Sequence, residues 1–210
     1  TVLMHDSVSA ANVKLNRTQV QIVRGDTYRL YVKGTTAKVK WYSSNAKIAT
    51  VSNGKVTAKK KGTAVIYAKV NGKKYACKVT VVTQQRAYID TLQRQINIQR
   101  RRYGFNSYDR NPLLQQAAQK RAKELAEKFS HARPNGYSWA SAISMRYNFK
   151  KASELTARYY TDPQEVVDAW MSKASTKAKI ISKRYNEIGV GVYLDEDGFL
   201  YYAVIVAVRK

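Results

Sequence analysis

The residues whose types and spacing could support chemistry lie in KFSHARPNGYSWASAI, residues 128–143. His131 stands there with Ser130, Arg133 and Trp139 close by. An imidazole titrates near neutral pH, so His131 is a candidate general base or cleft ligand; alternatively, it hydrogen-bonds a carboxylate and fixes a loop. Ser130 is its neighbour in sequence, but adjacency alone does not make a nucleophile–base pair. The role of His131 therefore depends on the partners that the rest of the chain supplies.

Positive charge dominates the composition. The 210 residues include 38 Lys+Arg and 14 Asp+Glu, a net charge of +24. Residues 1–84 hold 16 basic and 2 acidic side chains (net +14), and residues 85–210 hold 22 and 12 (net +10). Such a field attracts polyanions. A nucleic-acid domain usually concentrates its charge in one motif, so this spread favours an anionic cell-wall polymer or another surface polyanion, with nucleic acid as an alternative.

Other features of the composition limit the class of protein. With 44% hydrophobic residues, the chain can bury real cores. Cys77 is the only cysteine, so no internal disulfide can form. No run approaches the ~18 apolar residues of a transmembrane helix. The opening TVLMHDSVSAAN lacks the basic start and apolar core of a signal peptide, which fits a mature or trimmed form.

Residues 13–82 have the pattern of short strands joined by turns. TYRLYV, residues 27–32, alternates apolar and polar residues, the period of two of a half-buried strand. Asn53-Gly54 and Asn71-Gly72 predict tight hairpins, because both residue types tolerate positive φ. Several such strands predict a small β-sandwich with Trp41 as a core anchor. AKKKG, with Lys59, Lys60 and Lys61, is expected to be a charged turn.

The same stretch is similar to a known family. VKWYSSNAKIATVSNGKVTAKKKGTAVIYAKVNGKKYACKVTVV resembles the bacterial immunoglobulin-like domain of invasin and intimin type. The family's motifs Trp, Ser-Ser-Asn, Ala-Thr-Val, Gly-x-Val-Thr-Ala and Lys-Gly-Thr-Ala follow here in order. The resemblance implies an extracellular spacer or adhesive module that is not an enzyme.

After Val82 the apolar period becomes helical. A first helix is expected around AYIDTLQRQI, and Asp162-Pro163 starts a third with a capping-box pattern. Asn111 can cap the second helix, with an apolar stripe at Leu114, Ala118, Ala122, Leu125 and Phe129. EIGVGVYL, the turn DEDG and FLYYAVIVAV predict a closing hairpin, whose last strand is apolar on both faces and therefore central. Helices on such a sheet make an α+β or α/β/α sandwich.

The order of these elements, with FSHARPNG and IGVGV, resembles the CAP superfamily of cysteine-rich secretory and pathogenesis-related proteins. The resemblance implies that His131 is the first of two cleft histidines and that Glu154 is the cleft glutamate. The second histidine would fall at or near Thr176, where none lies, and His5 is in the other half of the chain. Because one imidazole and one carboxylate make a poor zinc site, we expect no metal and no cofactor. Glu154 is either a cleft group or a buried carboxylate partnered by Arg133 or His131.

The sequence thus predicts an all-β Ig-like sandwich followed by an α/β/α (α+β) sandwich of CAP type. We expect an arm at residues 1–12, the Ig-like domain at 13–82, a linker at 83–87 and the CAP domain at 88–210. The predicted function is binding by a secreted or cell-wall-associated bacterial protein, with a peptide or glycan as a further ligand of the cleft. The alternatives are a hydrolase that acts on wall peptide or glycan through His131 and Glu154, and a nucleic-acid-binding protein. The remaining cleft or loop candidates are Ser130, Arg133, Trp139 and Thr176.

Overall fold

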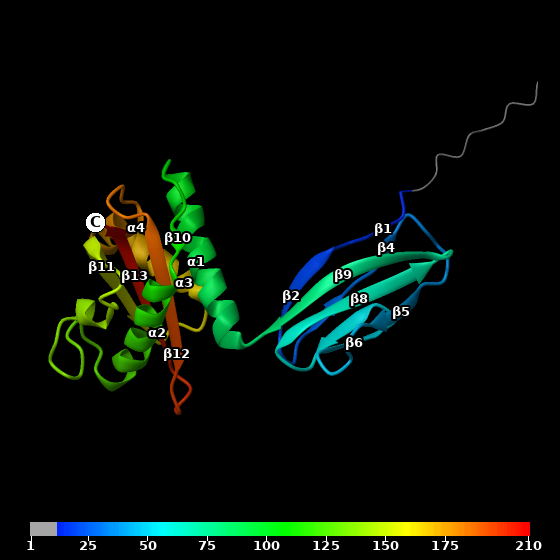
Figure 1. Ribbon diagram of the computed structural model, residues 1–210, viewed down its shortest axis with the longest axis horizontal. Coiled ribbons are helices and arrows are strands. Elements are labelled where there is room, and N and C mark those ends of the chain that lie inside the picture. The colour runs from blue at the N-terminus through cyan, green and yellow to red at the C-terminus, as the bar shows by residue number, and fades with distance from the viewer. Residues whose placement is uncertain (1–11) are drawn as a thin grey trace, which may run out of the picture. The chain divides into compact units, whose positions relative to one another are not determined.

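The computed structural model describes residues 12–210, which form two compact units divided between Gln84 and Gln85 (Figure 1). The arm expected at residues 1–12, with His5, lies outside the described residues except for residue 12. Strand β9 ends at Val82 and helix α1 begins at Gln84, so of the linker expected at 83–87 only Thr83 lies outside regular structure. The first turn of α1 is anchored within the C-terminal unit, because the side-chain amide of Gln85 donates to Val192 O at 2.5 Å.

The N-terminal unit is a sandwich of short strands. One sheet has the strand order β2-β9-β8-β5, a second has β3-β7-β6, and β1 pairs with β4. The strands are β1 Lys14–Leu15, β2 Gln19–Val23, β3 Thr27–Arg29, β4 Val32–Lys33, β5 Lys40–Ser43, β6 Ala49–Ser52, β7 Lys55–Ala58, β8 Gly62–Val70 and β9 Lys73–Val82. The inward side chains, among them Ile22, Ile66, Cys77 and Val79, form one buried cluster. The predicted β-sandwich is confirmed.

The turns of this unit follow their sequence signals. Asn53, Gly54, Asn71 and Gly72 all have positive φ, as the tight β6–β7 and β8–β9 hairpins require. Trp41 packs against the core cluster but is only partly buried.

One strand prediction was wrong. Residues 27–32 form two strands, because β3 pairs with β7 whereas β4 pairs with β1. The chain therefore leaves one sheet for another at Leu30, which is buried and donates its backbone N–H to Gly54 O. Alternation of residue types does not report such a change of partner strand.

The C-terminal unit combines four strands and four α-helices. Its sheet has the order β10-β12-β13-β11, in which only β10 and β12 pair in parallel. The elements are α1 Gln84–Arg102, β10 Asp109–Arg110, α2 Pro112–Glu127, the 3-10 helix η1 Trp139–Ala142, β11 Phe149–Arg158, α3 Pro163–Ser172, α4 Ala174–Ile180, β12 Glu187–Leu194 and β13 Leu200–Arg209. Asn111 caps α2 and Asp162 caps α3 through their side-chain oxygens, as predicted.

Helices cover both faces of this sheet (Figure 1). On one face α2 and η1 pack against Ile205 and Ala207 of β13. On the other face α1, α3 and α4 bury Leu155, Val190 and Val204. Residues 201–207 of β13 are all buried, so the prediction of a central strand covered on both sides is confirmed. The predicted α/β/α sandwich is confirmed with it.

Close packing of α2 on β12 explains the IGVGV sequence. A Cβ atom added at Gly189 or Gly191 would overlap the backbone of Leu114 or Ala118 in α2. The helix also satisfies strand backbone groups, because the Gln119 side-chain amide donates to Val192 O at 2.9 Å and accepts from Val192 N at 3.3 Å. The glycines therefore set the distance between helix and strand.

The apolar stripe predicted for α2 is correct except at its end. Leu114, Ala118, Ala122 and Leu125 are buried. Phe129 is not part of the helix, since α2 ends at Glu127 and Lys128 is extended. The Phe129 side chain is exposed, with the Arg158 guanidinium 4.5 Å from its ring centroid. The predicted stripe was thus one turn too long.

Candidate functional site

His131 and Glu154 come together on the face of the sheet that α2 covers. Glu154 lies on β11, and its side chain is fully buried, whereas the His131 side chain, in the loop after α2, is 59% exposed. His131 Nδ1 is 2.6 Å from Glu154 Oε2. The buried carboxylate therefore holds one ring nitrogen of an imidazole that otherwise faces solvent.

The second oxygen of this carboxylate is held by Arg121 of α2. Arg121 is fully buried, and its Nε donates to Glu154 Oε1 at 2.7 Å. Its two other nitrogens donate to Glu124 Oε2 at 2.8 Å and to Ser130 O at 2.7 Å. Burial alone would lower the pKa of the Arg121 guanidinium, but the hydrogen bonds that it donates to Glu154 and Glu124 outweigh burial and raise that pKa.

A further arginine continues the network into the loop. Arg133 is buried and forms a two-pronged ion pair with Glu124, with Nη2–Oε1 at 2.8 Å and Nε–Oε2 at 3.1 Å, and Nη1 donates to Ser141 Oγ at 2.8 Å. Burial raises the pKa of the Glu124 carboxyl, but hydrogen bonds from Arg133 and Arg121 outweigh it and hold that pKa below its ordinary value. These contacts fix the loop that carries His131 against α2 and η1.

Two smaller contacts complete the loop. Ser130 Oγ accepts from Ala132 N at 3.1 Å, so this hydroxyl stabilises the local turn. Trp139 starts η1, donates its backbone N–H to His131 O at 3.0 Å and packs on the cluster beneath α2. The Ser130 side chain and the Trp139 backbone thus support the position of His131.

Helix α4 approaches the site through a residue that the sequence analysis did not single out. Lys179 Nζ donates to the backbone oxygen of Glu154 at 2.9 Å. Burial lowers the pKa of the Lys179 ammonium, against the opposing charge of Glu154. Thr176 instead donates its hydroxyl to Trp170 O at 2.6 Å, within the α3–α4 connection. The α4 side chain that contacts Glu154 is therefore Lys179.

Comparison with known families agrees with this arrangement of strands and helices. Residues 93–207, more than half of the chain, match the model of the cysteine-rich secretory protein family, CAP. The chain belongs to this family. Residues 9–81 match the bacterial Ig-like domain, group 2. Both resemblances predicted from the sequence are confirmed, and the two units are an Ig-like domain and a CAP domain.

Three bacterial proteins are similar to the CAP domain at low identity. The chain is 28% identical over 98 residues to the protein YkwD of Bacillus subtilis, which covers 45% of this chain and 38% of YkwD. An outer surface protein of Borrelia burgdorferi has a TM-score of 0.55 at 22% identity, covering 60% of this chain and 96% of that one. An extracellular SCP-domain protein of Bacillus anthracis has a TM-score of 0.53 at 18% identity, and the match covers 64% of this chain and 46% of that protein. These structures show the fold. No helix among residues 12–210 is long and apolar enough to cross a membrane.

The donor groups of the CAP domain do not suit the metal that the family resemblance implies. His131 Nδ1 already bonds Glu154 Oε2, and the other oxygen of Glu154 bonds Arg121. Within the described chain no three His, Cys, Asp or Glu side chains group around one point. A zinc site needs three or four such ligands. We therefore derive no chemistry through a metal, and the expected absence of zinc stays a prediction.

The sequence contained a signal for the central arginine of the CAP domain. Arg121 lies four residues after Ala117 and four before Leu125, on the buried stripe of α2. A charged residue at a core position of an amphipathic helix indicates a buried partner. Of the two partners predicted for Glu154, His131 is present, while Arg133 pairs with Glu124 and Arg121 is a partner that was not predicted.

Proposed function

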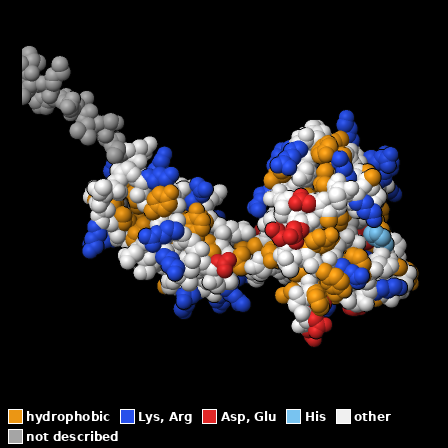
Figure 2. Space-filling view, turned by 180° about the vertical axis from the view of Figure 1, so that it is seen from behind, with side chains coloured by type: hydrophobic (Ala, Val, Ile, Leu, Met, Phe, Trp, Pro, Cys, Tyr) orange, Lys and Arg blue, Asp and Glu red, His pale blue; other side chains and the backbone are white. Residues whose placement is uncertain are grey.

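We propose that this protein is a secreted or cell-surface bacterial binding protein that associates with an anionic cell-wall polymer. In this proposal the Ig-like domain is a spacer or adhesive module, and the CAP domain carries an incomplete cleft site around His131. The observation that carries the proposal is the excess of positive charge in both halves of the chain, net +14 in residues 1–84 and +10 in residues 85–210. On the face drawn in Figure 2, lysine and arginine side chains are scattered over both domains. Positive charge spread in this way suits a long polyanion better than it suits a ligand held in a single pocket.

The geometry around His131 favours binding over catalysis. Both oxygens of Glu154 accept charge-assisted hydrogen bonds, so this carboxylate is poorly suited to take a proton from water. The exposed imidazole can still contact a peptide or glycan. The cleft therefore contributes a polar contact to a bound ligand.

Retention on cell walls tests the main proposal. The full chain is applied at ~150 mM salt to intact Gram-positive walls, to walls stripped of teichoic acid, and to immobilised DNA. We expect strong retention on intact walls that falls steeply with salt, because exposed charges are screened over ~8–10 Å at physiological ionic strength. Equal retention on stripped and intact walls would contradict the proposal. Tighter binding to DNA than to intact walls would favour the nucleic-acid alternative.

One observation favours a second candidate, a hydrolase. A buried carboxylate that holds one nitrogen of an imidazole, as Glu154 holds His131, orients the other nitrogen as a base. Such a base can activate a water and accelerate hydrolysis by roughly 10²–10⁴-fold. The candidate substrates are wall peptide and glycan.

Turnover assays separate the hydrolase from the binding protein. We expect no release of products from peptidoglycan or casein above background. His131→Gln removes the imidazole while a side-chain amide can still contact Glu154, so the fold should persist. Turnover that is abolished by His131→Gln at unchanged thermal stability would establish the hydrolase.

A further inference from the structure

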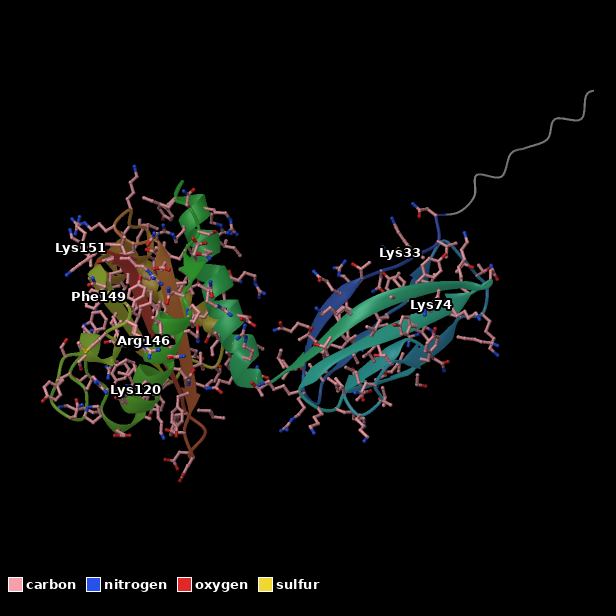
Figure 3. The ribbon with its side chains drawn as sticks, viewed as in Figure 1. Lys33, Lys74, Lys120, Arg146, Phe149 and Lys151 are labelled. Atoms are coloured by element: carbon pink, nitrogen blue, oxygen red, sulfur yellow. The ribbon has the colours of Figure 1, made fainter. Side chains whose placement is uncertain are left out.

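A row of lysines crosses the outer face of the four-stranded sheet of the Ig-like domain. Lys40 on β5 lies opposite Lys69 on β8, which lies opposite Lys74 on β9. All three side chains are exposed, and Figure 3 shows Lys74 at the β8–β9 end of the sheet. Like charges directly opposite one another on neighbouring strands destabilise a sheet. The row therefore lowers the stability of the domain.

No acidic side chain in the described part of this domain is paired with the lysine row. Asp26 is the only acidic residue among residues 12–84, and it follows β2 at the Val23–Val82 end of this sheet, whereas Lys74 lies near the other end of β9. Lysines on edge strands can protect against edge-to-edge aggregation. That role can account for Lys40 on the edge strand β5 and for Lys74, where β9 extends beyond its pairing with β2, but Lys69 lies on the inner strand β8. A ligand that supplies negative charge would remove the cost.

Two tyrosines form the next row of the same face. Tyr42 and Tyr67 are cross-strand partners whose rings stack at a centroid distance of 5.0 Å. Lys74 Nζ lies 4.4 Å from the Tyr67 ring centroid. Because β8 lies between β5 and β9, Tyr67 is held between Tyr42 and Lys74. This arrangement orders the Lys74 ammonium before any ligand binds, so less side-chain entropy is lost on binding.

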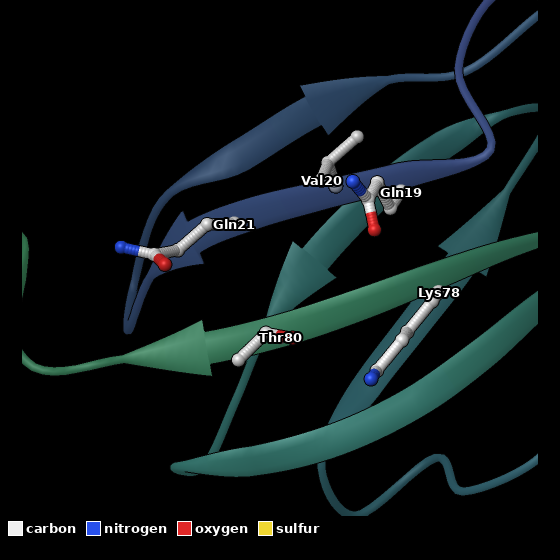
Figure 4. Close-up of a pocket in the computed structure, with 5 residues that line it drawn as sticks. All are labelled: Gln19, Val20, Gln21, Lys78 and Thr80. Atoms are coloured by element: carbon white, nitrogen blue, oxygen red, sulfur yellow. The ribbon is translucent and has the colours of Figure 1, made fainter.

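The face continues into a shallow hollow beyond the tyrosines. Its volume is about 370 Å³, and Figure 4 shows its lining residues, Gln19, Val20, Gln21, Lys78 and Thr80. Outward residues of β9 are two apart, which is about 6.8 Å along an antiparallel strand. The face from Lys74 to Thr80 is thus a track of about 20 Å that offers ammonium groups, amides and a hydroxyl.

We propose that this tyrosine–lysine surface, defined by Lys40, Lys69, Lys74, Tyr42 and Tyr67, is the site where the Ig-like domain binds a linear polyol-phosphate polymer of teichoic-acid type. Phosphates would pair with the lysine row, and polyol hydroxyls would bond the polar groups of the hollow. Ammonium groups suit phosphodiesters, and the amides and the hydroxyl of the hollow suit the hydroxyl groups of a polyol. The inference rests on the proposed association with an anionic wall polymer and names the surface responsible.

A pair of charge-matched variants tests the surface in the full chain. The surface variant carries Lys40→Gln, Lys69→Gln and Lys74→Gln. The turn variant carries Lys59→Gln, Lys60→Gln and Lys61→Gln in the exposed β7–β8 turn. Both lose three positive charges, so they differ only in where the charge is removed. Binding of each to poly(glycerol phosphate) and to oligothymidylate is measured by titration at ~150 mM salt, with thermal unfolding as the check on folding.

We expect the surface variant to bind poly(glycerol phosphate) about tenfold more weakly and the turn variant to change by about twofold or less. Equal losses in the two variants would overturn the surface while leaving charge-driven wall binding intact. No binding by the unaltered chain would refute the proposed function and the surface together. Tighter binding to oligothymidylate than to poly(glycerol phosphate) would overturn the ligand class. Should the triple surface variant fold poorly, Lys69→Gln alone must still weaken binding more than Lys60→Gln does.

Discussion

The two domains use their charged residues in different ways. Every ion pair found in residues 12–210 lies in the CAP domain, where Arg121, Glu124, Arg133 and Glu154 form a buried network. The Ig-like domain has 16 basic side chains, with one acidic residue in its described part. Buried charges need partners, so the CAP network is a requirement of the fold. The exposed lysines of the Ig-like domain do not need a charged partner for folding, so their positive charge can attract a ligand.

The largest expected effect comes from breaking the CAP network at its centre. Arg121→Met would leave Glu154 and Glu124 without their shared cation, and breaking such a buried pair costs about 3–5 kcal/mol. The measurement is urea unfolding of the full chain, followed by the CAP tryptophans in a Trp41→Phe background. Lys120→Met, on the exposed side of the same helix, is the matched control and should change stability little.

A double variant sharpens this test. Adding Glu154→Gln to Arg121→Met removes one uncompensated charge, so stability should partly recover. A loss from Arg121→Met no larger than that from Lys120→Met would show that the network does not support the CAP domain.

Acid should destabilise the CAP domain through three of its carboxyls. Burial raises the pKa of Asp90, Glu124 and Glu187, but the hydrogen bonds that these carboxylates accept outweigh burial. The donors are arginines at Asp90 and Glu124, and mainly Tyr147 and Asn111 at Glu187. All three pKa values are therefore lower in the folded state. Their contribution is fully present above the ordinary values, 3.8 for Asp and 4.5 for Glu. It is lost as the pH falls through the lower native values.

Tryptophan reporters distinguish the two domains in this experiment. Trp41 belongs to the Ig-like domain, and Trp139 and Trp170 to the CAP domain. The Trp41 signal is measured in a Trp139→Phe, Trp170→Phe variant. In thermal melts between pH 7 and pH 3, we expect the stability reported by the CAP tryptophans to fall more than the stability reported by Trp41. Equal losses would mean that general charge repulsion, and not the paired carboxyls, governs acid sensitivity.

A smaller effect of opposite sign is expected in the Ig-like domain. Lys69→Gln removes the middle charge of the lysine row and should stabilise the domain by roughly 0.2–1 kcal/mol. The unfolding midpoint of the Trp41 signal measures it, and Lys60→Gln in the turn is the control. A destabilised Lys69→Gln variant would contradict the claim that the row is repulsive.

The last prediction is that zinc has no effect on the stability of the CAP domain. A ligand that binds only the folded state raises its stability by an amount set by its affinity. Because the donors around His131 are already engaged, added zinc should leave the CAP melting temperature unchanged. Elemental analysis that finds about one zinc per chain, lost on His131→Ala, would show that the cleft charges serve a metal.

Local patterns in the sequence determined both folds and most element types. Asn-Gly pairs need positive φ, Asn111 and Asp162 supply cap oxygens, and β13 is apolar on both faces. Each of these signals acts within a few residues, so it can be read without knowing what packs nearby. The motifs that resemble the CAP family also placed His131 and Glu154 among the site candidates.

Tertiary structure alone decided which partners meet. Residues 27–32 change sheet at Leu30, Glu154 pairs with Arg121 from a helix 33 residues earlier, and Lys179 reaches the Glu154 backbone from α4. The lysine row likewise depends on strand register, which brings Lys40 of β5 beside Lys69 of β8, while Lys74 faces Lys69 across the β8–β9 hairpin. Contacts of this kind depend on strand pairing and helix packing, whose energies come from surfaces distant in the chain. A local pattern can show that a buried charge or an exposed lysine needs a partner, but not which residue the folded chain will bring to it.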